Sequence, residues 1–480
     1  MSIMTETRRD VAAPLCVDLD GTLIKTDLLF EMLLLLLKTR PLALFQLPLW
    51  LFKGKAHFKQ ELAARAHLDV TCLPYRAPLL SFLKDEQRAG RKLVLATAAD
   101  ARVARQVAAH LGIFSAVVAS DGAVNCSGSR KLGALERECG PEGFVYVGDA
   151  PVDLQVWRHA RGAILVGGGN RFVKQLNNVE RTFEDDTRPW EALRAMRLHQ
   201  WAKNVLIFVP LLLAHEVTDP ARVAAALLAF LAFSLCASSV YVQNDLLDLE
   251  ADRHHPRKRF RPFASGALPV KFGLLLAPAL LALAVLAALP LSSTFLGVLG
   301  LYFVLTLSYS LYFKRKAILD VLLLAILYTV RIVAGGVAVG LVVSPWLLAF
   351  AMFFFLNLAY VKRFSELKDL PGESFLRARG YTSDDLEGLA DLGVASGYVS
   401  ILVVALYINS PEVSELYRTP ELLWLLCPLL VYWVSRVWLL ARRGQMHDDP
   451  VIFALRDRVS YVVGACAVLV GAAAAGGWWA

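Results

Sequence analysis

Cysteine is scarce in this sequence, and the seven that occur among 480 residues show no paired spacing. Their scatter excludes a disulfide framework and a zinc site, and it fits a reducing compartment. The first fourteen residues contain no apolar run that could serve as a signal peptide, so we expect the first domain to stay in the cytoplasm. The sequence also offers no Ser-His-Asp or Cys-His arrangement for nucleophilic catalysis.

Apolar residues are abundant instead, at 56% of the chain, and most of the excess follows residue 200. This proportion is too high for a soluble protein, and 480 residues allow two or three domains. The net charge is +8, but the basic residues cluster in particular loops between apolar segments. Nucleic acid is therefore not the expected partner.

Nine apolar segments after residue 190 are candidates for membrane-spanning helices. They run over 198–215, 221–243, 271–290, 294–312, 317–341, 345–361, 386–408, 421–440 and 458–479. Lys and Arg concentrate in every second connection, and the positive-inside rule places those connections in the cytoplasm. We predict an all-α polytopic membrane domain over 190–480 with nine transmembrane helices, in a bacterial-type inner (plasma) membrane.

The connection after the second apolar segment carries three carboxylates, Asp245, Asp248 and Asp252. Their i, i+3, i+7 spacing places all three on one face of a helix, about a turn apart. Adjacent carboxylates repel one another unless a cation lies among them, and Mg²⁺ combines such oxygen ligands with substrate phosphates. The positive-inside rule alone would explain the basic residues of this connection, but it would not explain the three carboxylates among them. The bases that match phosphate oxygens are Arg253, Lys258, Arg259 and Arg261.

Near the N-terminus, a short apolar run ends at Asp18 and Asp20, where a buried strand is expected to give way to a loop. The first carboxylate of such a pair can attack phosphorus while the second protonates the leaving oxygen. Further candidates follow at predicted strand ends and at a predicted helix start. They are Thr97 and Lys131, to hold a phosphoryl group, and Asp149 and Asp153, as ligands of Mg²⁺.

In order and placement these residues resemble the four motifs of the haloacid dehalogenase phosphatases. The resemblance implies that Asp18 is the nucleophile and Asp20 the general acid and base. It implies that Thr97 and Lys131 hold the phosphate. It also implies a Mg²⁺ site among Asp18, Asp20, Asp149 and Asp153.

The predicted strands of this region alternate with helices, which indicates an α/β domain over 1–170 with a parallel sheet wrapped by helices. Residues 26–90, between the first two motifs, would form a helical cap. Within this cap, 28–37 and 41–52 are unusually apolar but too short to span a bilayer. They would be buried cap helices or would lie against the membrane. The polar stretch 171–189 is predicted to link the two domains.

The string Asn244-Asp-x-x-Asp-x-x-x-Asp resembles the first aspartate-rich motif of the UbiA superfamily of intramembrane prenyltransferases. With Lys258-Arg259-x-Arg261 it is more similar to one branch, the decaprenyl-phosphate phosphoribosyltransferases. That branch carries a string similar to the one at Lys203 and Asn204, which implies a site role for both. Each domain is therefore expected to hold one Mg²⁺ site.

The second basic connection departs from the prenyltransferase pattern. Enzymes of the superfamily that use a prenyl diphosphate usually have a second aspartate-rich motif there, whereas this chain offers one carboxylate, Asp320. A charged Arg331 inside an apolar span needs a partner, and we expect a phosphate or carboxylate contact. Extra bases suit a donor with a second, remote phosphate, such as 5-phosphoribosyl 1-diphosphate. The further candidates for substrate contacts are Tyr309, Lys316, Lys362 and Arg363.

These features predict a bifunctional membrane enzyme. It would transfer 5-phosphoribose from 5-phosphoribosyl 1-diphosphate to a polyprenyl phosphate and then remove the 5-phosphate. One alternative is an aromatic prenyltransferase that uses a polyprenyl diphosphate and has a phosphatase domain of separate function. Another is a membrane anchor or scaffold for a soluble phosphatase. The sequence is compatible with a homo-oligomer and leaves the lipid length open.

Overall fold

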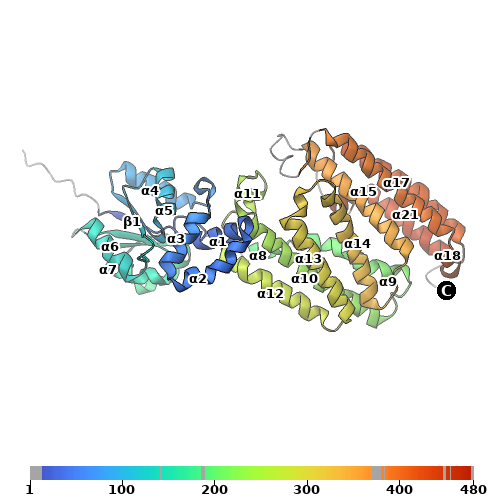
Figure 1. Cartoon of the computed structure of the whole chain (residues 1–480), viewed down its shortest axis with the longest axis horizontal. Helices are drawn as coiled ribbons and strands as arrows, with labels where there is room; N and C mark the ends of the chain where they lie inside the picture. Colours follow the sequence, from blue (N-terminus) through green and yellow to red (C-terminus); the bar gives the residue numbers. More distant parts are fainter. Residues whose placement is uncertain are drawn as a thin grey trace, which may run out of the picture. The chain divides into compact units, whose positions relative to one another are not determined.

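The computed structural model describes residues 13–140, 143–184, 190–369, 380–382, 384–446, 450–454 and 456–476. The chain forms two compact units, whose elements are labelled in Figure 1. The first consists of Met1–Met196 with Tyr241–Pro278, and the second of Arg197–Val240 with Ala279–Ala480. The segment that carries the three carboxylates 245, 248 and 252 thus belongs to the same unit as the N-terminal sheet.

A parallel six-stranded sheet forms the centre of the first unit, in the order β3-β2-β1-β4-β5-β6. The inner strands form because short runs of Leu, Val and Ala are buried on both faces, as in parallel sheets that helices cover. The α/β class predicted from the sequence is confirmed. The strands are β1 Leu15–Val17, β2 Leu93–Asp100, β3 Ala116–Ser120, β4 Val145–Gly148, β5 Gly162–Val166 and β6 Val179–Phe183.

Helices connect the strands, and the longest insertion lies between β1 and β2. Met32 and Leu36 of its first helix belong to the same hydrophobic core as Leu15 and Val17 of β1, so this helix packs on the sheet. The insertion contains α1 Leu28–Thr39, η1 Pro41–Gln46, α2 Leu47–Phe52, α3 Lys55–Arg65, η2 Val70–Cys72 and α4 Ala77–Arg88. The later connections contain α5 Ala101–Leu111, α6 Ser129–Cys139, η3 Pro151–Asp153, α7 Leu154–His159 and η4 Gly167–Gln175.

The range 171–189 differs from the predicted linker in its first part. Residues Val179–Phe183 form β6, which pairs in parallel with β5. β6 is an edge strand with three exposed side chains, and only Phe183 is buried. An apolar pattern this sparse does not distinguish an edge strand from a polar linker in the sequence. The rest of the predicted linker, 185–189, lies outside the described residues.

The other elements are helices. Within the described residues, seven helical segments are long and apolar enough to cross a membrane: α10, α12, α13, α14, α15, α17 and Pro420–Arg442. Two more predicted spans fall on the shorter apolar helices Leu198–Leu213 and Arg458–Ala474. The helical multi-pass class is confirmed, whereas the count of nine spans is not. In chain order the elements are α8 Glu191–Met196, η5 Leu198–Phe208, α9 Val209–Leu213, α10 Pro220–Leu247, α11 Leu249–His254, η6 Lys258–Phe260, α12 Val270–Ala288, α13 Ser293–Leu311, η7 Phe313–Arg315, α14 Leu319–Val339, α15 Pro345–Asp369, α17 Asp385–Ile408, α18 Pro411–Leu416, η8 Pro420–Leu425, α19 Leu426–Arg442, α20 Pro450–Ala454 and α21 Arg458–Ala474.

Close packing in the second unit positions two predicted site residues. Gly335 of α14 lies against the backbone of η5, where a Cβ atom would come within 2.0 Å of the carbonyl oxygen of Ile207. Only glycine permits this approach. The same contact between η5 and α14 brings Asn204 to Arg331, whose Nε donates to the Asn204 side-chain oxygen at 2.7 Å.

Candidate active sites

Three of the predicted residues lie where neighbouring strands of the sheet end. Asp18 comes directly after β1, Asp149 comes directly after β4, and Thr97 lies in the second half of β2. Because β2, β1 and β4 are adjacent and parallel, these positions meet at the carboxyl edge of the sheet. Asp18 and Thr97 are both buried there.

Lys131, near the start of α6, links the charged groups at this edge. Its Nζ lies 2.9 Å from Asp18 Oδ1 and donates to the Tyr146 hydroxyl at 2.8 Å. That hydroxyl donates in turn to Asp153 Oδ1 at 2.9 Å. All four side chains are buried, so the ammonium compensates carboxylates that water screens poorly. Sequence reasoning missed Tyr146, because a tyrosine within an apolar strand gives no signal of its own.

Asp18, Asp149 and Asp153 form a group that could hold a metal ion, since one oxygen from each lies within 4.8 Å of the others. Such an oxygen donor set suits Mg²⁺. Burial raises the pKa of Asp18 to about 7, against the opposing effect of Lys131. Burial also raises the pKa of Asp149 to about 6. A bound cation would favour the charged form of both carboxyls.

Asp20 lies two residues further on, against the first helix of the insertion. The backbone N–H of Leu28 donates to its Oδ1 at 2.8 Å. Burial, and after it the neighbouring charge of Asp27, raises the pKa of Asp20 to about 8. A carboxyl that keeps its proton near neutral pH suits a group that protonates a leaving oxygen.

The turn after β1 also orients Asp149. Gly21 has φ +75°, and a Cβ atom there would come within 2.4 Å of Asp149 Oδ2. The hydroxyl of the next residue, Thr22, donates to Asp149 Oδ1 at 2.9 Å. Glycine is therefore required for both the backbone conformation and the close approach.

Asp18, Asp20, Lys131 and Asp149 line a cavity of about 770 Å³ within the first unit. Its wall includes Lys59 of α3, Arg76, and residues of the segment 265–271. Lys59 Nζ donates to the carbonyl of Ala98 at 2.6 Å and to Asn125 Oδ1 at 3.0 Å. Sequence reasoning missed Lys59 and Arg76, because neither lies near a motif in the chain.

The helix expected to carry all three further carboxylates is interrupted at the middle one. α10 ends at Leu247 and α11 begins at Leu249, and Asp248 between them has φ −104° and ψ 16°. The helical hydrogen bonds are kept on both sides of the break. The N–H of Asp248 donates to the carbonyl of Asn244, and the N–H of Asp252 donates to the carbonyl of Asp248. The helix is therefore interrupted at a single residue, and its i→i−4 hydrogen bonds continue through Asn244, Asp248 and Asp252.

Basic side chains reach all three carboxylates. Arg261 Nη1 lies 3.2 Å from Asp245 Oδ1 and 2.6 Å from Asp252 Oδ2, and both carboxylates are buried. Asp248 Oδ1 is paired instead with Lys38 Nζ of α1, at 2.8 Å. The structure brings Asp245, Asp252 and Arg261 together, whereas Asp248 faces the N-terminal insertion.

Arg253, predicted to bind phosphate, is engaged within the fold. Its guanidinium pairs with both carboxylate oxygens of Glu31 in α1, at 2.8 and 2.6 Å. Its Nε donates to the carbonyl of Ala264 at 3.0 Å, and its side chain is 5% exposed. This bidentate pair favours a structural role over the predicted phosphate contact. Of the other predicted bases, Lys258 is half-buried and Arg259 is exposed.

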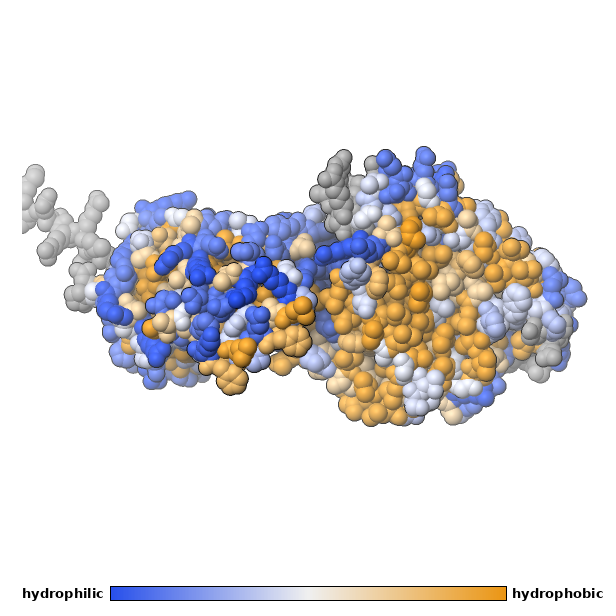
Figure 2. Space-filling view, viewed as in Figure 1, coloured by the Kyte–Doolittle hydropathy of each residue, from blue (hydrophilic) through white to orange (hydrophobic). Residues whose placement is uncertain are grey.

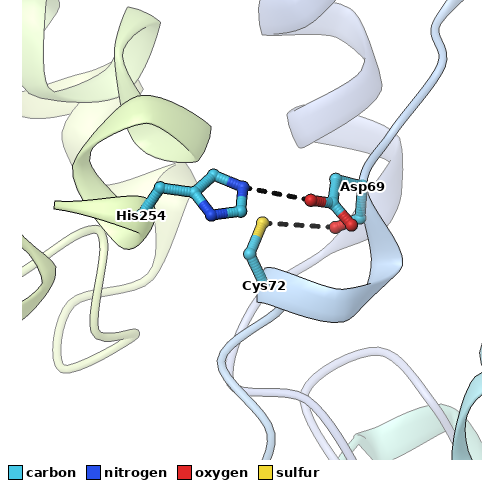
Figure 3. Close-up of side chains that lie close together, drawn as sticks. All are labelled: Asp69, Cys72 and His254. Carbon is cyan, nitrogen blue, oxygen red and sulfur yellow. Dashed lines mark hydrogen bonds and ion pairs between the residues drawn. The ribbon is translucent and has the colours of Figure 1, made fainter. Parts of the chain in front are cut away.

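Two more contacts join the same segment to the insertion. His254 Nε2 of this segment lies 3.0 Å from Asp69 Oδ2 of the insertion. Within the insertion, Cys72 Sγ donates to the carbonyl of Asp69 at 3.2 Å (Figure 3). These three residues offer donors within 4.8 Å of one another that could hold a metal ion. Lys271 pairs with Asp27 at 2.9 Å. The segment between α10 and α12 is thus held against α1 and η2 by several polar contacts.

In the second unit, the single carboxylate of the second loop is paired with a base. Arg363 of α15 forms an ion pair with Asp320 at the start of α14, and both are almost fully buried. Tyr381 donates to Asp320 Oδ1 at 2.6 Å, and Arg363 also pairs with Glu366. Two residues that the sequence places in separate loops are therefore brought together.

Arg331 lies in α14 and is 5% exposed. Its guanidinium donates to the side chain of Asn204 at 2.7 Å and to the Tyr302 hydroxyl at 2.9 Å. It lies 5.4 Å from the centre of the Tyr328 ring, over which Lys203 also lies, at 5.8 Å. Among the residues that the structure describes, the hydrogen-bond partners of Arg331 are neutral and include no carboxylate, and the phosphate contact stays a prediction.

The remaining predicted residues occupy separate elements. Asn244 lies in the last turn of α10, Tyr309 in α13 and Lys362 in α15, and all three are half-buried. Lys316 follows η7 and is exposed, with its ammonium 5.5 Å from the centre of the Tyr312 ring.

Two family models match the regions that carry these groups. Residues 205–456 match the UbiA prenyltransferase family, and residues 15–158 match the haloacid dehalogenase-like hydrolases. The chain therefore belongs to the UbiA prenyltransferase family and carries a haloacid dehalogenase-like domain before its membrane helices. It is a multi-pass membrane enzyme of the transferase class.

One relative spans almost the whole chain, and the others reported cover a little more than half of it. "Uncharacterized protein y4nM" of Sinorhizobium fredii is 42% identical over 468 residues, which cover 95% of this chain and 90% of the relative. The decaprenyl-phosphate phosphoribosyltransferase of Mycolicibacterium smegmatis is 37% identical over 279 residues, covering 56% of this chain and 88% of that enzyme. The structure of a UbiA homolog from Archaeoglobus fulgidus bound to GPP and Mg²⁺ is 18% identical, covers 58% of this chain and 99% of that chain, and has a TM-score of 0.46.

Proposed function

We propose that the membrane domain transfers 5-phosphoribose from 5-phosphoribosyl 1-diphosphate to a polyprenyl phosphate, and that the N-terminal domain then removes the 5-phosphate. The relatives named decaprenyl-phosphate phosphoribosyltransferase support the first step. The observation that carries it is the ion pair of Asp320 with Arg363. The second loop thus offers one carboxylate, already engaged by Arg363 and Tyr381, where the first offers three, and this disfavours a prenyl diphosphate clamped between two metal sites.

In the transfer step, an oxygen of the lipid phosphate forms a bond to the anomeric carbon while the bond from that carbon to the diphosphate breaks. Asp245, Asp248 and Asp252 would hold Mg²⁺, for which Asp248 would have to leave its ion pair with Lys38, and the ion would stabilise the leaving diphosphate when bound. Arg261, already placed between two of these carboxylates, would contribute a further positive charge beside the diphosphate. Lys258 would contact the donor from the same loop.

In the second step, an Asp18 carboxylate oxygen attacks phosphorus while Asp20 gives its proton to the departing 5-oxygen of the ribose. Water then hydrolyses the aspartyl phosphate, and its proton returns to Asp20. Thr97 and Lys131 would hold the phosphoryl oxygens. Asp18, Asp149 and Asp153 would hold Mg²⁺, whose charge offsets that of the phosphate when it is bound. Each domain would thus have its own Mg²⁺ site.

We place both sites on the cytoplasmic face of a bacterial inner membrane. The support is the alternation of basic and non-basic connections along the membrane helices, since basic connections stay in the cytoplasm. The proposed phosphatase domain extends past the predicted end at 170 to include β6, and the proposed transferase domain covers 190–480. That the protein forms a homo-oligomer stays a prediction.

The direct test is to incubate the purified protein with Mg²⁺, radiolabelled 5-phosphoribosyl 1-diphosphate and a polyprenyl phosphate, and then to extract the lipids. We expect radiolabel in the lipid fraction, and it should depend on the polyprenyl phosphate. Absence of labelled lipid together with prenylation of an aromatic acceptor from a polyprenyl diphosphate would replace the proposal by its alternative.

A further inference from the structure

We propose that the segment Pro41–Phe52, which comprises η1 and α2, lies on the surface of a lipid bilayer. Four large apolar side chains recur along it at intervals of three or four residues, which places them on one helical face. They are exposed to an unusual degree: Leu42 by 78%, Phe45 by 79%, Leu49 by 63% and Phe52 by 88%. Figure 2 shows hydrophobic surface on the N-terminal unit in the region that α2 occupies in Figure 1.

The other side of the segment already has its packing partners. Trp50 is 7% exposed and belongs to the core shared with β1, and the Arg65 guanidinium stacks 4.6 Å from the centre of its ring. Ala43 and Leu47 also pack against this core. The exposed stripe, which consists of Leu42, Phe45, Leu49 and Phe52, is therefore a separate face from the one that packs on the core. Apolar surface of this kind on a solvent-exposed face indicates a contact with a lipid or with a partner protein.

The charges at the two ends favour a lipid surface as the occupant. Arg40 precedes the segment, and Lys53 and Lys55 follow it. Basic residues beside an apolar helical face are the pattern of a helix that lies in the bilayer interface and attracts anionic headgroups. The segment has twelve residues, too few to cross the hydrocarbon core as a helix.

Contacts within the first unit place α1, the helix directly before the segment, beside the ends of two membrane-spanning helices. Lys38, near the end of α1, pairs with Asp248 just after α10. Asp27, which caps the start of α1, pairs with Lys271 in the first turn of α12. Because α10 and α12 are both long and apolar enough to cross a membrane, the stripe follows a helix anchored where the chain enters the bilayer. The inference does not depend on the identity of the transferred group.

The contact can be tested by photocrosslinking in the full-length protein. Phe45 and Phe52 are replaced, one at a time, by p-benzoyl-phenylalanine, and the protein is placed in nanodiscs of phosphatidylcholine and phosphatidylglycerol. Val124 of the same unit, 46% exposed and outside the stripe, is the matched control position. After irradiation, intact-protein mass spectrometry should show phospholipid adducts at positions 45 and 52 and none at 124.

A second variant tests the cause of the contact. Leu49→Asp combined with Leu42→Asp should remove most of the lipid adduct at position 45, and an unchanged melting temperature would show that the fold is intact. Nanodiscs of phosphatidylcholine alone should give fewer adducts, because the flanking bases then have no anionic headgroups to attract. Adducts at 45 and 52 no more frequent than at 124 would overturn the proposal. A product of twice the chain mass would also overturn it, because a second copy would then cover the stripe.

Discussion

At the scale of single residues, the chemistry of the N-terminal domain depends most on Asp18. Asp18→Asn removes the proposed nucleophile with almost no change in shape, and Lys131 keeps a carboxylate neighbour in Asp153, at 3.7 Å. We expect phosphatase activity to fall on the order of 10⁴-fold or more. The variant should still consume the ribosyl donor and accumulate the phosphorylated lipid, which mass spectrometry separates from the wild-type product by one phosphate.

Asp85→Asn, an exposed carboxylate on α4, is the matched control and should give the wild-type product. If Asp18→Asn and the wild type deliver the same phosphorylated lipid, the N-terminal domain acts on another substrate.

Two bases of the same loop should differ in effect because their surroundings differ. Arg261→Ala removes the guanidinium shared by Asp245 and Asp252, so two buried carboxylates lose a common positive partner. Transfer should lose kcat as well as affinity for the donor. Lys258→Ala should mainly raise KM for the donor, by a factor that corresponds to about 2 kcal/mol for one charge-assisted contact. Steady-state kinetics of both variants measure this, and an unchanged KM for the donor in both would mean that these bases serve only membrane topology.

At the scale of elements, the turn after η6 should tolerate no side chain at Gly266. This residue has φ +73°, and a Cβ atom would come within 2.5 Å of the Lys25 Cβ and 3.3 Å of Pro74. The backbone conformation alone costs an alanine about 1–2 kcal/mol, and the contact with Lys25 adds to this. We expect Gly266→Ala to lower the melting temperature by about 4 °C or more.

Gly297→Ala in α13 is the control, since a Cβ atom there meets nothing within 4 Å. It should leave the melting temperature unchanged or raise it slightly, because alanine favours a helix over glycine by roughly 0.5–1 kcal/mol. Equal behaviour of the two variants would mean that the turn does not pack against the N-terminal domain as described.

The elements also show what the sequence could predict. Asp18 and Asp149 follow apolar runs, so their meeting at one sheet edge follows from the order of the strands. β6 was not predicted because an edge strand buries too few side chains to produce an alternating apolar pattern in the sequence. The pairs of Asp248 with Lys38 and of Arg253 with Glu31 join residues more than 200 positions apart in the chain, and no local periodicity predicts such contacts.

At the scale of the whole molecule, the two proposed activities should be separable although they reside in one chain. Asp252→Asn removes a proposed metal ligand of the transferase and touches no group at the carboxyl edge of the sheet. Transfer should be lost, whereas hydrolysis of a chemically prepared lipid-linked 5-phosphoribose should continue at the wild-type rate. Asp18→Asn is the reciprocal variant. Loss of both activities in a well-folded Asp252→Asn protein would contradict separate sites.

The first unit takes in Tyr241–Pro278, although the chain on either side of that segment belongs to the second unit. A gene divided near codon 190 would therefore not yield two self-sufficient products. The shorter product would carry Glu31 and the longer one Arg253, so the division would break this buried ion pair and uncover the surfaces around it. Such halves would have to reassemble as a heterodimer in the membrane, so selection should favour keeping both in one reading frame.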